Sequence, residues 1–248
     1  TTPCAVANGT LTVDLSGGAP ISAGATGTNT LRLSGTEAQI TAALASVSYQ
    51  GTLNFNGADT LTVLSTDAAG TPLSDTDTVT INVGAVNDAP VNTVPGAQTV
   101  DEDTSLAVPG LSVTDVDGNL ATTQLSVTNG NLTVELSGGA TISGGANGTN
   151  TLRLSGTEAQ INAALATVSY QGTLNFTGAD TLTVLSTDAA GTPLSDTDTV
   201  TINVGSVNDA PVNTVPGTQS VDEDTSLAVP GLSVTDVDGN LAPTQLSV

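Results

Sequence analysis

The chain has 248 residues and a formal net charge of −22, with 24 acidic residues against Arg32 and Arg153 and no lysine or histidine. This balance excludes nucleic acid as a partner, because phosphate binding needs a basic surface, and membrane insertion is excluded because no apolar run approaches the roughly 20 residues of a span. A disordered chain is excluded as well, because 38% of the residues are hydrophobic and only 10% are charged.

An internal repeat divides the sequence. Residues 8–127 align with residues 129–248 without a gap and differ at 12 of the 120 positions. A period of this length is too long for a solenoid repeat of roughly 20–50 residues and suits a whole domain. We therefore predict a repeat lacking its first strands over 1–86, a complete repeat over 87–207 and the N-terminal part of a third repeat over 208–248.

The complete repeat opens with three short predicted strands. Residues 90–96 contain two prolines, which suit an edge strand. Residues 98–106 form a strand pattern that an acidic cluster interrupts. Residues 111–114 alternate apolar and polar side chains, which indicates one buried and one exposed face.

Two further strands are predicted over residues 124–128 and 132–136. The Asn129-Gly130 pair between them is a strong signal for a two-residue hairpin. Residues 138–150 are rich in Gly, Ser and Asn, and we expect a loop there.

One helix is predicted after that loop. Thr157 and Gln160 have the spacing of a capping box, in which each side chain bonds the backbone of the other residue. Ile161 and Leu165 follow at near-helical spacing. We predict a helix of two or three turns over residues 158–166, covering an open end of the domain.

Three strands complete the repeat. They are predicted over residues 168–176, 181–186 and 199–204, with turn signals every 8–12 residues. The sequence thus predicts an all-β protein of tandem Greek-key β-sandwich domains, each with about seven strands and one short helix.

The motif Val-Asn-Asp-Ala-Pro ends each repeat. It stands at residues 86–90 and again, unchanged, at residues 207–211. An alternating strand leads into each copy, and the proline then stops ladder pairing and stiffens the chain. We interpret the motif as a joint between domains.

Oxygen-bearing side chains gather around this joint. Calcium takes six to eight oxygen ligands from carboxylates, amides, backbone carbonyls and water. Turns of an antiparallel sandwich can meet at one end of the domain, and several carboxylates there would repel one another without a cation. An alternative is a set of solvated acidic turns, because Asp and Asn are common turn residues. The calcium candidates at the first joint are Asn87, Asp88, Asp115, Asp117, Asn119 and Asp188.

The order of these motifs resembles the cadherin repeat. A strand followed by Val-Asn-Asp-Ala-Pro looks like the cadherin linker, residues 100–104 are similar to the early glutamate motif, and residues 114–118 look like the paired-aspartate motif. Residues 182–188 are similar to the last-but-one strand and the aspartate after it. The helical insert departs from animal cadherins and looks instead like the cadherin-like or Ig-like repeats of giant bacterial adhesins of the repeats-in-toxin type.

The resemblance implies calcium shared between two domains at each joint. Carried over residue by residue, it implies that Glu102 meets five residues of the second joint: Asn208, Asp209, Asp236, Asp238 and Asn240. The chain departs from the family at Ala85 and Ser206, where cadherins place an aspartate, and Asp180 is only a weak match to the family's second glutamate. We therefore expect one or two ions per joint.

Three functions remain open at this point. The first is a non-enzymatic extender of an extracellular adhesin or matrix fibre, which calcium stiffens and whose partners are neighbouring repeats. Such an extender holds a distant domain, which binds a cell-surface or matrix ligand, away from the cell. The second is a module that binds carbohydrate or protein through residues 138–150, although sugar sites usually use aromatic platforms and aromatics are 2% of this chain. The third, a two-carboxylate glycosidase, is disfavoured because the chain has no histidine and no aromatic cleft.

The incomplete first repeat raises one more alternative. Residues 1–86 lack a counterpart of residues 90–120, whereas residues 208–248 repeat that piece. Either the chain belongs to a longer parent, or identical subunits join head to tail by strand exchange into an extracellular filament. In the filament, Asp236 and Asp238 would join Asp67 of the next molecule.

Overall fold

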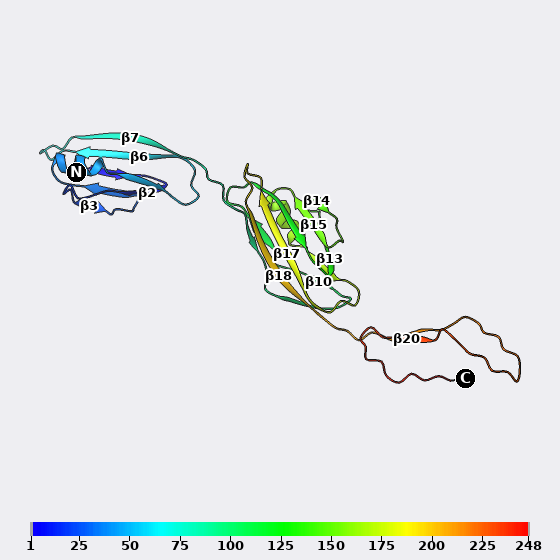
Figure 1. Ribbon diagram of the computed structural model, residues 1–248. Helices are drawn as coiled ribbons and strands as arrows, with labels where there is room; N and C mark the ends of the chain where they lie inside the picture. Colours follow the sequence, from blue (N-terminus) through cyan, green and yellow to red (C-terminus); the bar gives the residue numbers. More distant parts are fainter. Residues whose placement is uncertain (1, 248) are drawn as a thin grey trace. The chain divides into compact units, whose positions relative to one another are not determined.

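The computed structural model describes residues 2–247, which form two compact units (Figure 1). Unit 1 comprises residues 1–87 and unit 2 comprises residues 88–248. Both units are built mainly from β-strands and each contains one short helix. Neither helix in the described residues has the length or the apolar character needed to cross a membrane.

Unit 2 contains the complete repeat. Its elements, in chain order, are β8 (Val91–Thr93), β9 (Gln98–Asp101), β10 (Ser105–Ala107), β11 (Ser112–Thr114), β12 (Leu120–Ser126), β13 (Gly130–Thr133), β14 (Thr141–Gly145), β15 (Thr151–Ser155), α2 (Glu158–Leu165), β16 (Ser169–Gly172), β17 (Gly178–Asp188), β18 (Ser195–Gly205), β19 (Val212–Thr214) and β20 (Ser233–Thr235). The repeat thus has eleven strands rather than about seven. The predicted strand over residues 98–106 forms two strands, β9 and β10, and β14 lies in the stretch predicted as a loop.

The strands of the repeat form a β-sandwich. One layer is a six-stranded sheet with the order β14-β15-β12-β17-β18-β9, and the other contains the three-stranded sheet β10-β16-β13. The long pair β17 and β18 runs through the middle of the unit (Figure 1). Between the layers lie aliphatic side chains such as Leu125, Leu152, Leu182 and Ile202, all fully buried, with Tyr170 as the one fully buried aromatic.

A short ribbon closes one side of the sandwich. β8 and β11 pair with each other in an antiparallel two-stranded ribbon, and the ribbon packs against α2, β17 and β18. Its central residue Val113 is fully buried. The helix α2 therefore has a partner on the side of β11, as well as the sandwich core into which Ile161 and Leu165 project.

The predicted helix is confirmed. α2 begins after Thr157, whose side chain accepts a hydrogen bond from the backbone of Gln160, while the Gln160 side chain accepts one from the Thr157 N–H. The capping box thus satisfies two of the backbone N–H groups that a helix start leaves without intrahelical partners.

The predicted hairpin at Asn129-Gly130 is wrong. β12 pairs with β15 and β17 in one layer, whereas β13 pairs with β16 in the other layer, so the chain crosses between layers at this point. Gly130 has a packing reason, because a Cβ atom there would collide with the ring of Tyr170. The Gly-rich stretch 138–150 is also not wholly a loop, since it contains β14, which pairs with the following strand β15.

Unit 1 repeats this architecture in part. Its elements are β1 (Thr2–Ala5), β2 (Gly9–Thr12), β3 (Ile21–Gly24), β4 (Thr30–Leu33), α1 (Glu37–Leu44), β5 (Ser48–Gly51), β6 (Gly57–Thr66) and β7 (Ser74–Val83). The five-stranded sheet β3-β4-β1-β6-β7 faces the pair β2-β5. Cys4 is buried in its core at the position that Leu125 occupies in unit 2.

Candidate functional site

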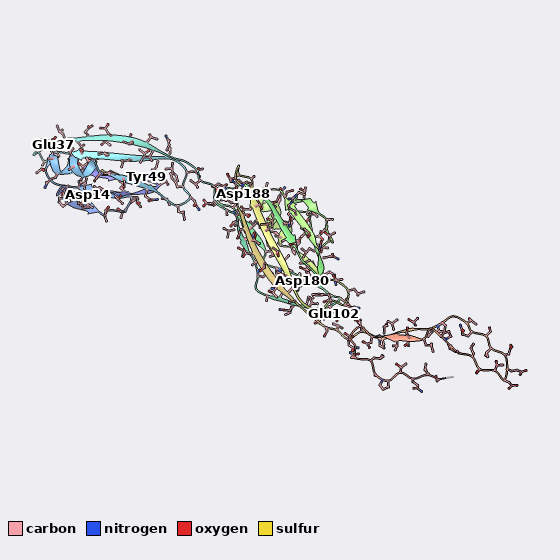
Figure 2. The ribbon with its side chains drawn as sticks, viewed as in Figure 1. Asp14, Glu37, Tyr49, Glu102, Asp180 and Asp188 are labelled. Atoms are coloured by element: carbon pink, nitrogen blue, oxygen red, sulfur yellow. The ribbon has the colours of Figure 1, made fainter. Side chains whose placement is uncertain are left out.

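A parallel strand pair positions Glu102 at one end of unit 2. β9 pairs with β18 in parallel, with Asp101 opposite Gly205, so Glu102 lies where the chain leaves the last strand of the repeat. The backbone N–H of Glu102 donates to the Gly205 carbonyl at 2.8 Å, and the Val207 N–H donates to Glu102 Oε1 at 2.8 Å. Glu102 is only 3% exposed, so its carboxylate is held at the start of the second joint (Figure 2).

Three carboxylates converge there. Glu102, Asp209 and Asp238 each place a ligand oxygen within 4.8 Å of the other two. The Asp209 N–H donates to Asp238 Oδ2, and the Asp238 N–H donates to Asp236 Oδ1 at 3.0 Å. Asp236 thereby orients the turn that carries Asp238.

Amide side chains complete the cluster. The Asn240 side-chain amide donates to Asn208 Oδ1 at 2.6 Å. Glu102, Asn208, Asp238 and Asn240 line one cavity of about 360 Å³ together with Asn175, Thr177, Ser206 and Val237. The structure therefore brings five of the six second-joint residues to one place, and Asp236 supports them through the backbone of Asp238.

The chemistry of this cluster fits calcium. Two oxygens bound to one calcium ion at about 2.4 Å lie at most about 4.8 Å apart, and the ligand oxygens of the three carboxylates lie within this distance of one another. Among the described residues, Asp209 Oδ2 is buried and has no hydrogen-bond donor. A buried carboxylate oxygen without a donor is costly unless a cation neutralises it. Glu102, Asp209, Asp238, Asn208 and Asn240 are the residues that could hold the ion.

The first-joint residues of unit 2 repeat part of this pattern. The Asp88 N–H donates to Asp117 Oδ2 at 2.7 Å, and the Asp117 N–H donates to Asp115 Oδ1 at 3.0 Å. The same bonds join Asp209, Asp238 and Asp236 at the second joint. Asp115 is 8% exposed, and its own N–H donates to Glu158 Oε2.

Asn119 and Asp188 belong to the same end of unit 2. The Asn119 carbonyl accepts from the Ala189 N–H, and Asp188 pairs with Leu120 across β12 and β17. Asp188 is 2% exposed, and its Oδ1 accepts from the N–H groups of Ala190 and Leu194. This end lies opposite the end that carries Glu102 (Figure 2).

Asn87 and Asp67 belong to unit 1. Asp67 Oδ1 accepts from the N–H groups of Ala69 and Leu73, as Asp188 does in unit 2, but Asp67 is exposed.

Sequence reasoning gave Asp180 only a weak role in metal binding, whereas the structure gives it a structural one. Asp180 is 2% exposed and accepts four hydrogen bonds of 2.8–3.1 Å, from the N–H groups of Thr128, Asn129 and Thr181 and from the Tyr170 hydroxyl. These bonds hold the crossing between β12 and β13. Burial, with the hydrogen bond to Asp180 and its charge, raises the pKa of Tyr170 well above its usual value.

Unit 1 contains the same arrangement around Asp59. Burial by itself would raise the pKa of Asp59, but four hydrogen bonds outweigh that effect and hold the pKa below its ordinary value. Their donors are the N–H groups of Asn8, Thr60 and Ala7 and the hydroxyl of Tyr49. The hydrogen-bond donors around Asp59 and Asp180 compensate the burial of these carboxylates without a metal ion. In this respect Asp59 and Asp180 differ from the candidate metal ligands at the joints.

Comparison with known proteins gives a partial family match and several structural similarities. A family model described as the Protein GAMETE EXPRESSED 2 domain matches residues 109–196. No curated protein matches the chain. The solved structures of protocadherin gamma B2 extracellular cadherin domains 3–6 and of the protocadherin gamma B7 EC3–6 cis-dimer are similar at 16% and 18% identity, with TM-scores of 0.40 and 0.41. They cover 95% and 96% of this chain.

Mouse cadherin-23 EC22–24 is similar at 18% identity over 80% of this chain, with a TM-score of 0.35. The chain spans about half the length of these three solved chains, 51% to 53%.

Proposed function

We propose that this chain is a structural module of an extracellular adhesion protein, and that calcium bound at its joints stiffens the array of repeats. In this proposal the protein is not an enzyme, and its partners are neighbouring repeats. The observation that carries the proposal is the cluster of Glu102, Asp209 and Asp238, with its buried Asp209 oxygen that no donor reaches.

The position of the cluster supports a role as a joint. Glu102 is anchored by the parallel pairing of β9 with β18, so it belongs to the rigid sandwich. Asp209 and Asp238 lie beyond the last strand of that sandwich, in the segment that follows it. An ion bound by all three residues would tie the following segment to the sandwich, because calcium brings together ligands from separate elements.

The test is calorimetric titration of calcium into the full chain and into Glu102→Gln. The neutral amide removes one charged ligand from the second joint, and we expect the calcium affinity there to fall by roughly tenfold or more. Glu223→Gln is the matched control, because Glu223 aligns with Glu102 but is exposed. Its calcium affinity should equal that of the unaltered chain.

Magnesium provides a second control. Magnesium demands a smaller, near-octahedral shell and gives up water reluctantly, so it should bind this cluster much more weakly than calcium. Equal calcium affinity of the unaltered chain and of Glu102→Gln would show that the second joint is not the calcium site.

A further inference from the structure

The complete repeat contains three Asn-x-Thr triplets, in which x is not proline. They begin at Asn131, Asn147 and Asn175. In secreted proteins this triplet is the acceptor of N-linked sugars. Each of the three arises from a difference between the two copies, because unit 1 has Thr10, Thr26 and Asn56 where unit 2 has Asn131, Asn147 and Thr177. Unit 1 carries a different triplet, which begins at the half-buried Asn8.

Two of the three asparagines in unit 2 are engaged by the fold. The Val134 N–H donates to Asn147 Oδ1 at 2.9 Å, and Asn147 Nδ2 donates back to the Val134 carbonyl at 3.0 Å, so a sugar on that nitrogen would disturb the pair. Asn175 lines the cavity of the candidate calcium ligands, and its backbone N–H donates to Asp103 Oδ1 at 3.3 Å. A sugar on Asn175 would occupy that cavity.

Asn131 is placed differently, on the outer face of the three-stranded sheet β10-β16-β13. It lies in β13 opposite Gln171 of β16, and the next residue, Leu132, is fully buried in the core. Successive side chains of a strand point to opposite faces of the sheet. The side chains of Asn131 and Thr133 therefore point outward together, and both residues are exposed. The acceptor nitrogen and the threonine hydroxyl of this triplet are on the same solvent face.

The surface around Asn131 carries no charge. Its neighbours on the same face of the sheet, given by the strand register, are Thr133, Gln171, Ser169, Ser105 and Ala107. None of these residues is acidic, although the chain has 24 acidic residues. Hydroxyl and amide side chains both donate and accept hydrogen bonds, as sugar hydroxyls do. The face therefore suits a covalently attached sugar.

We propose that Asn131 carries an N-linked sugar, an inference that rests on the extracellular location in the proposed function. A bond forms between Asn131 Nδ2 and the anomeric carbon of the sugar, and the bond from that carbon to the diphosphate of an activated donor breaks. The diphosphate leaves with the electron pair of the broken bond, and one Nδ2 proton passes to a base, so nothing is oxidised or reduced. The donor is a sugar joined through diphosphate to a lipid or a nucleotide.

The experiment produces the full chain in two kinds of cell. In the first the chain passes through a eukaryotic secretory pathway, where the donor is lipid-linked. In the second it stays in a bacterial cytoplasm with an N-glycosyltransferase that uses a nucleotide sugar. Mass spectrometry of peptides identifies the modified asparagines after enzymatic release of the sugar, which converts each carrier asparagine to aspartate.

We expect the folded product to carry the sugar at Asn131, whereas Asn147 and Asn175 stay largely unmodified. Modification in one kind of cell only identifies the donor. A folded chain without sugar at Asn131 in both kinds of cell would overturn the proposal.

Thr133 provides the matched pair of variants. Thr133→Ala removes the hydroxyl of the triplet and leaves Asn131 in place, so the sugar at Asn131 should be lost. Thr133→Ser keeps the hydroxyl and should keep the sugar. Because Thr133 is exposed, both variants should fold as the unaltered chain does, which circular dichroism checks. Sugar retained at Asn131 in Thr133→Ala would show that the triplet does not direct the modification.

Calorimetric titration of calcium into the sugar-free chain separates this inference from the proposed function. Asn131 does not line the cavity of the candidate calcium ligands, so Asn131→Gln should bind calcium as the unaltered chain does. Sugar at Asn131 in a chain that binds no calcium would support the modification and refute the calcium joint. Calcium binding by a chain that never carries sugar at Asn131 would overturn the modification alone.

Discussion

At the scale of single residues, the carboxylates of this chain divide into two kinds. Asp59 and Asp180 are buried and each accepts four hydrogen bonds from neighbouring N–H and O–H groups. Such carboxylates are satisfied as anions by the protein itself. Asp209 is the opposite case, since one of its oxygens is buried without a donor. Burial and donor count, rather than the presence of an aspartate, distinguish structural carboxylates from candidate ligands.

The lowered pKa of Asp59 predicts acid sensitivity of unit 1. Because the folded-state pKa lies below the unfolded value of about 3.9, the ionised carboxylate stabilises the fold above that value, and the stabilisation is lost as pH falls through the lower folded-state pKa. Amide NMR signals of Ala7 and Asn8, which donate to Asp59, should report this loss below about pH 4. Asp59→Asn should abolish that pH-dependent step, and an unchanged acid transition in this variant would contradict the assignment.

At the scale of elements, the sequence predicted structure that depends on neighbouring residues, but it did not predict the pairing of strands that are distant in the chain. The capping box at Thr157 and Gln160 involves residues three apart, so the sequence alone placed the start of α2. The parallel pairing of β9 with β18 joins residues about a hundred positions apart and left no local signal. The hairpin predicted at Asn129-Gly130 was wrong, because the glycine makes room for the ring of Tyr170 and does not form a hairpin turn.

The capping box predicts a measurable contribution to stability. Thr157→Ala removes the side-chain acceptor of the Gln160 N–H and should lower the free energy of unfolding of unit 2 by about 1 kcal/mol. Thr157→Ser keeps the hydroxyl and serves as the control. Chemical denaturation of both variants checks this, and equal stability of Thr157→Ala and the unaltered chain would show that the cap is not needed.

At the scale of the whole molecule, the two units show what residues 90–120 contribute. In unit 2 this segment supplies β8 to β11, covers β17 and β18 and buries Val200 and Asp188. In unit 1 the counterparts Val79 and Asp67 are exposed. The difference arises from the segment and not from the sheet, because residues 57–84 and 178–205 are identical.

Calcium is predicted to stabilise the chain and to extend its repeats. A ligand that binds only the folded state adds about 2.7 kcal/mol at a hundredfold excess over Kd. The melting temperature should therefore rise in calcium, and solution scattering should report a more extended chain. Replacing both Asp236 and Asp238 with alanine should reduce these effects at the second joint and leave the sandwich of residues 88–205 folded, since both residues lie beyond β18.

Circular dichroism and scattering with and without chelator check this prediction. Identical melting curves in calcium and in chelator would refute calcium stabilisation. Unfolding of the sandwich in the double variant would show instead that residues 236 and 238 belong to its core.

The sequence by itself determined the repeat, the β-rich class, the position of the helix and the identity of the oxygen-bearing residues at the joints. These features depend on local composition, on side-chain periodicity and on the comparison of one copy with the other. The resemblance to cadherin repeats implied that Glu102 meets Asp209 and Asp238, and only the tertiary structure shows how these carboxylates come together. Glu102 reaches Asp209 and Asp238 because a parallel strand pair places it at the end of β18, and Asp180 turns away to bind the crossing between layers. Convergence depends on contacts between residues distant in the chain, and a single sequence does not record those contacts.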